Sequence, residues 1–149
     1  MIIPLSDINC IYLNMKNNIV VFVLGFIIIF SIYGIIFGLF LNDYSMALIN
    51  KYPSVFRQNP SIPTVALAHG LQTILILFLF RRMNINTLRE GAISGFIIFA
   101  LFEAIFAFFI YAIFSIIPIN DILLDILLSS VIGIIAGGAI GFLAGKFTN

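Results

Sequence analysis

Residues 122–144 read ILLDILLSSVIGIIAGGAIGFLA, a stretch that is long and apolar enough to cross a membrane as one helix. A helix needs about 20 mainly apolar residues to span the hydrocarbon core, and this stretch has 23. Residues 19–41, 64–80 and 91–117 form three more apolar runs. Because membrane barrels are built from alternating strands of only about 10 residues, the sequence predicts an all-α polytopic membrane protein with four transmembrane helices packed as a bundle.

The overall composition supports the same class. Apolar residues make up 62% of the 149 residues and charged residues 9%, with a mean hydropathy of +1.22, whereas soluble domains carry about 25% charged residues. The expected solvent is therefore the lipid bilayer. A net charge of +1 argues against nucleic acid as a partner, which requires a dense basic face. The single cysteine, Cys10, excludes an internal disulfide and a cysteine-based metal cluster.

Helix signals divide the chain, as a single domain over residues 1–149, into helices at about 19–41, 62–80, 88–117 and 121–145. Thr87 and Glu90 are spaced as a capping box at the start of the third helix. Pro118 is expected to end that helix, and Asn120 to cap the fourth.

Residues 42–61 form the only long connection, on the outer side of the membrane. Its apolar and aromatic residues fit either a short helix lying at the membrane interface or an irregular loop with aromatics at headgroup level, and the sequence leaves both open. They are Tyr44, Met46, Leu48, Tyr52 and Phe56.

Residues 1–18 are expected to be an N-terminal tail. Met15 and Lys16 followed by an apolar run are typical of a translation start, so residues 1–14 are expected to be a marginal extension. The apolar stretch of a cleaved signal peptide has about 7–15 residues. The run that begins at residue 19 has 23, which favours a retained anchor.

Basic residues predict the orientation. Five lie at one end of the expected helices and two at the other, and positive charge favours the cytoplasmic side. Both termini are therefore expected in the cytoplasm, in a bacterial inner membrane. The five are Lys16, Arg81, Arg82, Arg89 and Lys146, and the two are Lys51 and Arg57.

Three ionisable side chains lie within the apolar runs, and each is a functional-site hypothesis because such groups are costly in lipid. Counted from the outer helix ends at about 1.5 Å per residue, Asp125 lies ~7 Å deep, His69 ~10 Å and Glu103 ~20 Å, close to the midplane. Gln72 lies ~15 Å deep on the same count.

Polar residues on three helices could converge on these groups. Residues three and four positions apart share one face of a helix, which groups His69 with Gln72 and Thr73. Asp125 and Ser129 are four apart, and Glu103 and Tyr111 are eight apart, which is close to two turns. If the stripes face one another, they form a polar ladder that descends from the outer surface to the deepest carboxyl. Its members are His69, Gln72 and Thr73; Glu103 and Tyr111; and Asp125 and Ser129.

This ladder has two interpretations. As a cavity open to the outside, it would end in a carboxyl, Glu103, that can change protonation, which suits proton coupling or cation binding. As interhelical glue, a protonated Glu103 would bond to Gln72 or Thr73, and Asp125 would bond to His69 or simply lie near headgroup water. The sequence leaves both open.

Glycines at a spacing of four predict close helix packing, because glycine lets two backbones approach. The fourth helix carries a strip of them, whose partner is either inside the chain or a second copy, as in a homodimer or a larger membrane complex. Gly34 and Gly38, and Gly91 and Gly95, are the internal candidates. The strip is Gly133, Gly137, Gly141 and Gly145.

No catalytic or cofactor motif is present. The sequence has one histidine, no phosphate loop and no metalloprotease motif, so no cofactor, metal site or catalytic residue is predicted. Ser129, His69 and Asp125 could be arranged as an acyl-transfer triad, but their spacing is no motif, and an enzyme is the least favoured class.

The layout resembles small bacterial four-helix integral membrane proteins of uncharacterised function. The segments that carry the resemblance are residues 68–72 (AHGLQ), residues 89–95 (REGAISG) and residues 125–128 (DILL), within a similarity over residues 19–146. The resemblance implies membrane residence and assigns no functional residue. Two functions are therefore expected from the residues: permeation or proton-coupled transport of a small solute or ion through a site around Glu103, or a structural or accessory role in a membrane complex through the glycine face.

Overall fold

The computed structural model describes residues 5–114 and 116–148. Over these residues the chain is almost entirely helical. A short π-helical stretch, η1, lies between the first two α-helices, and no β-strand is present in the described part. The elements are α1 (Leu5–Ile35), η1 (Ile36–Phe40), α2 (Asn42–Lys51), α3 (Ile62–Arg82), α4 (Leu88–Ile113) and α5 (Ile119–Thr148).

Within the described residues, four helices are long and apolar enough to cross a membrane. The spans are Asn17–Phe40, Ile62–Arg82, Leu88–Ile113 and Ile119–Phe147. Large apolar side chains remain exposed along all four, as expected for a surface covered by lipid rather than water. The predicted fold class is thus confirmed: the chain is an all-α integral membrane protein whose apolar helices pack as a bundle.

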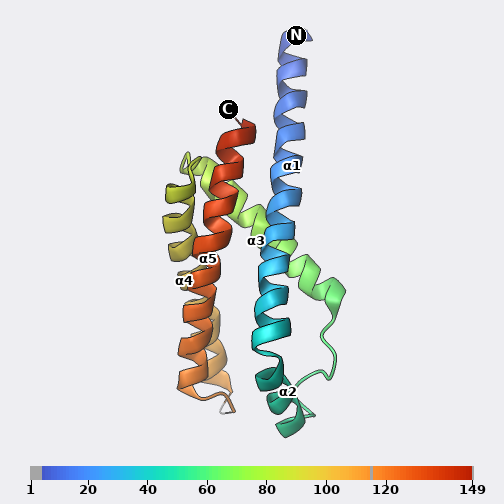
Figure 1. The fold of residues 1–149 in the computed structure, drawn as a ribbon, viewed down its shortest axis with the longest axis vertical. Coiled ribbons are helices and arrows are strands. Elements are labelled where there is room, and N and C mark those ends of the chain that lie inside the picture. Colours follow the sequence, from blue (N-terminus) through green and yellow to red (C-terminus); the bar gives the residue numbers. More distant parts are fainter. Residues whose placement is uncertain (1–4, 115, 149) are drawn as a thin grey trace.

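The helices are not packed equally. α4 and α5 form a long antiparallel pair, α1 lies along α5, and α3 crosses α1 at a slant (Figure 1). The first described turns of α1 and the last described turns of α5 lie at the same end of the bundle, and α2 lies at the other end. We call the α2 end the outer end and the opposite one the inner end, following the orientation predicted from the basic residues.

Glycines allow the close approach of α4 and α5. A Cβ atom built on Gly91, Gly95, Gly133 or Gly137 would lie within 3.0 Å of backbone atoms on the opposite helix. Real Cβ atoms essentially never approach so closely. The small-residue strip of α5 therefore faces α4 inside the chain. By contrast, no described atom of another element lies within 4 Å of a Cβ on Gly34.

The inner end of the glycine strip packs in the same way. A Cβ on Gly141 or Gly145 would meet backbone atoms at the start of α4 or just before it, at Thr87 and Asn86. Gly38, like Gly34, has nothing within 4 Å. The internal packing expected of Gly34 and Gly38 is therefore not found among the described residues.

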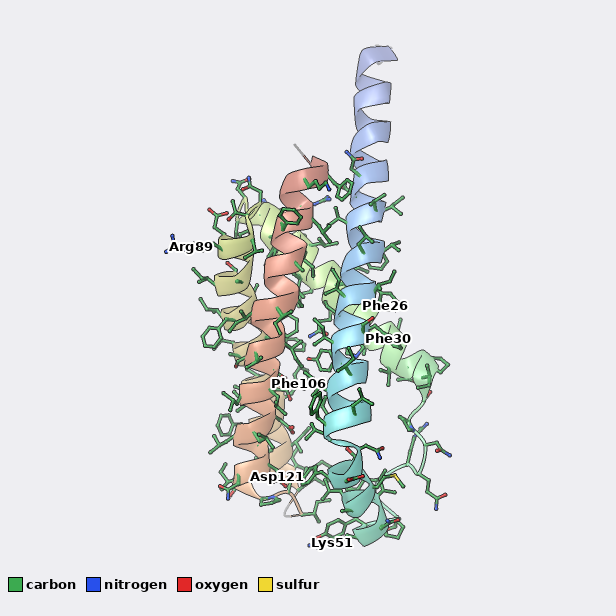
Figure 2. All side chains as sticks on the ribbon, viewed as in Figure 1. Phe26, Phe30, Lys51, Arg89, Phe106 and Asp121 are labelled. Atoms are coloured by element: carbon green, nitrogen blue, oxygen red, sulfur yellow. The ribbon has the colours of Figure 1, made fainter. Side chains whose placement is uncertain are left out.

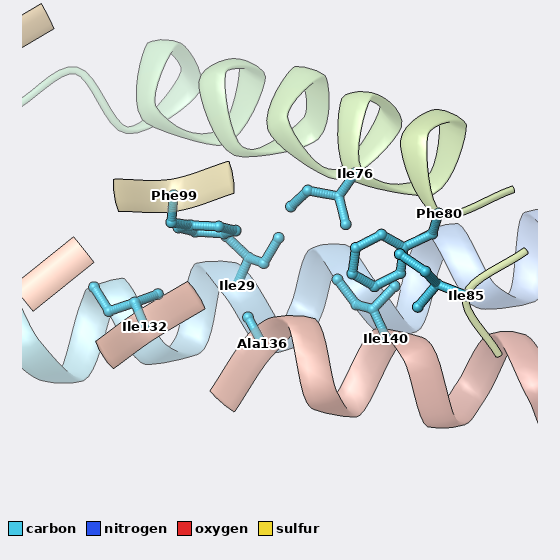
Figure 3. Packing of buried hydrophobic residues seen from close by; sticks show 8 residues of the cluster. All are labelled: Ile29, Ile76, Phe80, Ile85, Phe99, Ile132, Ala136 and Ile140. Atoms are coloured by element: carbon cyan, nitrogen blue, oxygen red, sulfur yellow. The ribbon is translucent and has the colours of Figure 1, made fainter. Parts of the chain in front are cut away.

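A small apolar core lies beside this contact, where α3 and α1 meet α5 (Figure 3). α5 contributes Ile132, Ala136 and Ile140 to this core, and each of them directly precedes a glycine of the strip in the sequence. One face of α5 therefore contacts α4, and the adjacent face contacts α1 and α3. The buried cluster is Ile29, Ile76, Phe80, Ile85, Phe99, Ile132, Ala136 and Ile140.

Two helix boundaries differ from the prediction. α1 begins at Leu5, so residues 5–18 continue the helix and are not an irregular tail. This stretch has no glycine or proline to stop a helix. Residues 1–4, which belong to the expected extension, lie outside the described part. α4 ends at Ile113 rather than at residue 117, because Phe114 adopts an extended backbone.

The predicted caps are partly present. The Glu90 amide donates to the Thr87 hydroxyl at 3.2 Å, which confirms Thr87 as the N-cap of α4. The cap of α5 differs from the prediction, because the Asp121 and Ile122 amides donate to the Pro118 carbonyl and Asn120 already lies in the first helical turn. In the 42–61 connection, the short-helix alternative holds for α2, whereas residues 52–61 are irregular.

Candidate intramembrane polar site

A polar stripe on the outer half of α5 faces α4. Asp121, Asp125 and Ser129 lie four residues apart, in line with the glycine strip that contacts α4 farther along. The Ser129 hydroxyl donates to Glu103 Oε2 at 3.2 Å. The same helix face therefore carries polar side chains in its outer half and glycines in its inner half.

Three polar side chains lie at the same distance along their helices from the outer helix ends. Because α4 ends at Ile113, Glu103 is ten residues from the outer end of its helix, and Ser129 and Gln72 are likewise ten residues from the starts of α5 and α3. At about 1.5 Å per residue, each lies ~15 Å along its helix. Glu103 is thus nearer the outer end than the ~20 Å expected when its helix was extended to residue 117.

A second polar pair lies on α3. His69 Nδ1 and Gln72 Oε1 are 3.2 Å apart, one helical turn from each other. Thr73 is fully buried, and its hydroxyl donates to the His69 carbonyl oxygen at 2.7 Å, within its own helix. A Cβ on Gly25 of α1 would lie 3.2 Å from the Thr73 methyl group. Thr73 therefore serves the packing of α3 on α1 and does not bond to Glu103.

Tyr33 of α1, which the sequence analysis missed, joins the two pairs. Its ring lies 4.4 Å from the His69 ring, at 33°. Its hydroxyl interacts with the side chains of Gln72 and Ser129 and lies near the Glu103 carboxyl. We use "polar cluster" below for these five residues: Tyr33, His69, Gln72, Glu103 and Ser129.

An available signal could have identified Tyr33. Phe26, Phe30, Tyr33 and Phe37 follow one another at helical spacing, and this tyrosine is the member of the stripe that carries a polar group. Phe30 contacts the His69 ring edge-on, with centroids 6.0 Å apart. Figure 2 shows Phe26 and Phe30 in the middle part of α1. Aromatic packing on α3 therefore positions the Tyr33 hydroxyl toward the polar groups.

Two members of the expected ladder behave differently. Tyr111 lies two residues from the end of α4 and is 44% exposed, so it does not share the depth of His69 and does not join the cluster. Asp125 does not bond to His69. It is half-buried and lies one helical turn outward from Ser129.

α2 contacts the outer end of the stripe through one hydrogen bond. The Tyr44 hydroxyl donates to the Asp121 carboxylate, which lies one turn outward from Asp125. Partial desolvation, together with the hydrogen bond to Asp121 and the charge of that carboxylate, raises the pKa of Tyr44 from 10.0 to about 12. Figure 2 shows Asp121 at the same end of the bundle as Lys51, and Arg89 at the opposite end.

The arrangement is suited to proton exchange. Hydroxyl, amide, imidazole and carboxyl groups lie in succession across four elements, and such groups can pass protons along hydrogen bonds. Among the described residues, no group of three His, Cys, Asp or Glu side chains is close enough together to hold a metal ion. In the described part, Asp121, Asp125 and Glu103 form no ion pair with a basic side chain.

Comparison of the chain with models of protein families, with curated proteins and with solved structures finds no match. The four apolar helices nevertheless make the chain an integral membrane protein.

Proposed function

We propose that this protein moves protons across the membrane through the polar cluster, with Glu103 as the group that gains and loses them. The observation that carries the proposal is the position of Glu103. It faces α5 and bonds to Ser129 instead of facing lipid.

The energetic cost of Glu103 supports a functional role. An acidic side chain in the middle of a membrane helix costs about 2.5–3.5 kcal/mol by insertion scales. A hydrogen bond between membrane helices returns on average only about 1 kcal/mol. The bond to Ser129 therefore does not offset the cost of Glu103, and helix association alone is a poor reason for its presence.

The surrounding groups support a route for protons. Asp121 and Asp125 lie successively outward from Ser129, which links Glu103 to the outer end. Tyr33 lies between the Glu103–Ser129 pair and Gln72. A proton that leaves Glu103 can therefore be accepted on the outer side by Asp125 or exchanged across the bundle through the tyrosine hydroxyl.

The experiment is a flux measurement on purified protein in liposomes that contain a pH-sensitive dye, with a potassium diffusion potential as the driving force. Wild-type protein should acidify or alkalinise the lumen faster than protein-free liposomes do. Glu103→Gln should reduce the flux to the protein-free level, and Glu103→Asp should retain part of it.

Glu90→Gln is the matched control, because Glu90 lies on the same helix but is exposed at its inner end. It should leave the flux unchanged. Wild-type flux in Glu103→Gln, at equal incorporation, would overturn the proposal, and so would wild-type protein that moves protons no faster than protein-free liposomes.

A second candidate, an accessory subunit or self-associating protein, is favoured by one observation. Gly34 on α1 and Gly38 on η1 are exposed, and no described atom of another element lies within 4 Å of a Cβ there. A partner helix could pack closely on them, whereas the glycine strip of α5 is already occupied by α4. If this role holds, Gly34→Leu with Gly38→Leu should abolish cross-linking between copies or to a partner, and Gly70→Leu, at an open site on α3, should not.

A further inference from the structure

We propose that α2 is a lid over the outer end of the polar stripe, held closed by the hydrogen bond from Tyr44 to Asp121. The inference rests on the proposed function for its purpose, since a lid would regulate access to Glu103. Its geometry stands on separate observations.

The first observation is where the contact falls. Tyr44 and Asp121 are 77 residues apart in the sequence, so their bond ties α2 to the start of α5. Asp121 is the outermost acidic residue of the stripe, followed inward by Asp125 and then by Ser129, which bonds to Glu103. A segment bound to Asp121 therefore lies at the point where water or a cation would first meet the stripe.

The second observation is how little else holds α2. None of its described residues is buried, and apart from Tyr44 it packs mainly on η1, the segment directly before it. A segment with few buried contacts opens locally at low cost, because little apolar packing is lost. Loss of one tertiary hydrogen bond should therefore shift α2 measurably toward an open state.

The third observation is the presence of hinges on both sides. η1 is π-helical, and the Leu41 amide bonds to the Ile36 carbonyl at 2.9 Å, five residues back. Such turns interrupt regular α-helix and often mark functional sites. Gly38 within η1 has open space around it. On the other side, residues 52–61 form an irregular connection that contains Pro53 and Pro60. α2 can thus move without displacing α1 or α3.

The test measures access to the stripe. Asp125→Cys is introduced in a Cys10→Ser background, and the protein is placed in nanodiscs so that a reagent can reach both faces of the bilayer. The measured quantity is the rate at which a membrane-impermeant methanethiosulfonate reacts with the introduced cysteine. Addition of Tyr44→Phe should raise the rate about three- to tenfold, the population shift expected from the loss of one hydrogen bond. Tyr52→Phe, which removes a hydroxyl next to the same helix, should leave the rate unchanged.

A second measurement covers failure of the cysteine variant to fold. Amide hydrogen exchange of residues 45–51 should be faster in Tyr44→Phe than in wild type, while exchange in α4 is unchanged. Equal labelling rates with and without Tyr44→Phe, or equal exchange, would overturn the lid. Neither measurement requires proton flux, so the labelling result would stand even if the transport proposal failed. Conversely, the effect of Glu103→Gln on flux would stand even if the lid proposal failed.

Discussion

Tyr33 lies where three membrane helices bring polar groups together. Its ring packs on His69, and its hydroxyl reaches Gln72 and Ser129. Ring and hydroxyl therefore have separable roles, because the ring contributes packing whereas the hydroxyl connects the hydrogen-bonded pairs of α3 and α4–α5.

We expect Tyr33→Phe to reduce proton flux at least ~10-fold, since a positioned proton-transfer group contributes about 10²-fold or more. Stability should change little, because phenylalanine keeps the ring contact with His69. The flux assay in liposomes and an unfolding titration in mixed micelles check the two parts. Phe30→Leu is the control for packing and should lower stability more than it lowers flux per folded molecule. Full flux in Tyr33→Phe would show that the hydroxyl is not on the route.

Tyr44 predicts a dependence on alkaline pH. Its pKa is about 12 in the folded protein, above its ordinary value of 10.0. A group whose folded pKa is raised stabilises the fold fully below its unfolded pKa, and this contribution is lost as pH rises through the folded pKa. The stability difference between wild type and Tyr44→Phe should therefore be constant from neutral pH to about 10 and disappear between about 10 and 12.

Unfolding titrations at a series of pH values measure this difference, with Tyr52→Phe as the matched variant. A difference that grows above pH 10 would contradict the expected sign.

Among the elements, the α4–α5 pair depends on glycine. A Cβ on Gly137 would meet the backbone of Gly91 and Gly95 within 3.0 Å, and backbone atoms cannot give way as the end of a flexible side chain can. The two helices would have to separate, which would also weaken the contact between Ser129 and Glu103 farther along the same face.

We expect Gly137→Ala to destabilise the protein by about 1–3 kcal/mol, the usual cost of overpacking. Gly70→Ala is the control, because nothing lies within 4 Å of that position on α3. It should be neutral or stabilising by up to about 1 kcal/mol, since alanine favours helix more than glycine does. Unfolding in mixed micelles compares the two. Equal effects of both substitutions would show that close approach of α4 and α5 is not required.

The elements also show which boundaries sequence patterns can predict. The start of α4 was predictable because the Thr87 hydroxyl caps a local amide three residues away. The end of α4 was not, because apolar residues continue to 117 and hydropathy alone cannot mark where a helix stops. The chain leaves helical geometry at Phe114 so that it can turn back into α5, whose first amides bond to Pro118.

For the whole molecule, the distribution of basic residues predicts the orientation. Arg81, Arg82, Arg89 and Lys146 are exposed, and Figure 2 places Arg89 at the end opposite Lys51. Positive charge favours the cytoplasmic side, so we expect both termini there. The side chain of Lys16, the fifth basic residue of this group, lies outside the described part.

The orientation can be checked with single cysteines in a Cys10→Ser background. An impermeant thiol reagent should label Lys51→Cys in intact cells, and should label Lys146→Cys only after the membrane is permeabilised. The opposite pattern would reverse the orientation, and labelling of both in intact cells would indicate insertion in two orientations.

The sequence by itself determined that lipid surrounds this protein, how many helices cross the membrane and which polar residues are costly in lipid. The reason is that the length of an apolar run and the transfer free energies of its side chains can be read from the sequence without knowing how the helices pack. It also placed Glu103 and Ser129 on helices that could meet. It could not decide that α5 packs on α4 rather than on a second copy, that Tyr33 joins the polar cluster, or that Tyr111 stays outside it.

Only the tertiary structure decided these points. In lipid, burial of apolar side chains hardly discriminates one helix face from another, so the sequence carries little information about which faces meet. Close contact of Gly91 and Gly95 with the glycine strip of α5 sets the rotation of the two helices, and that rotation brings Ser129 to Glu103.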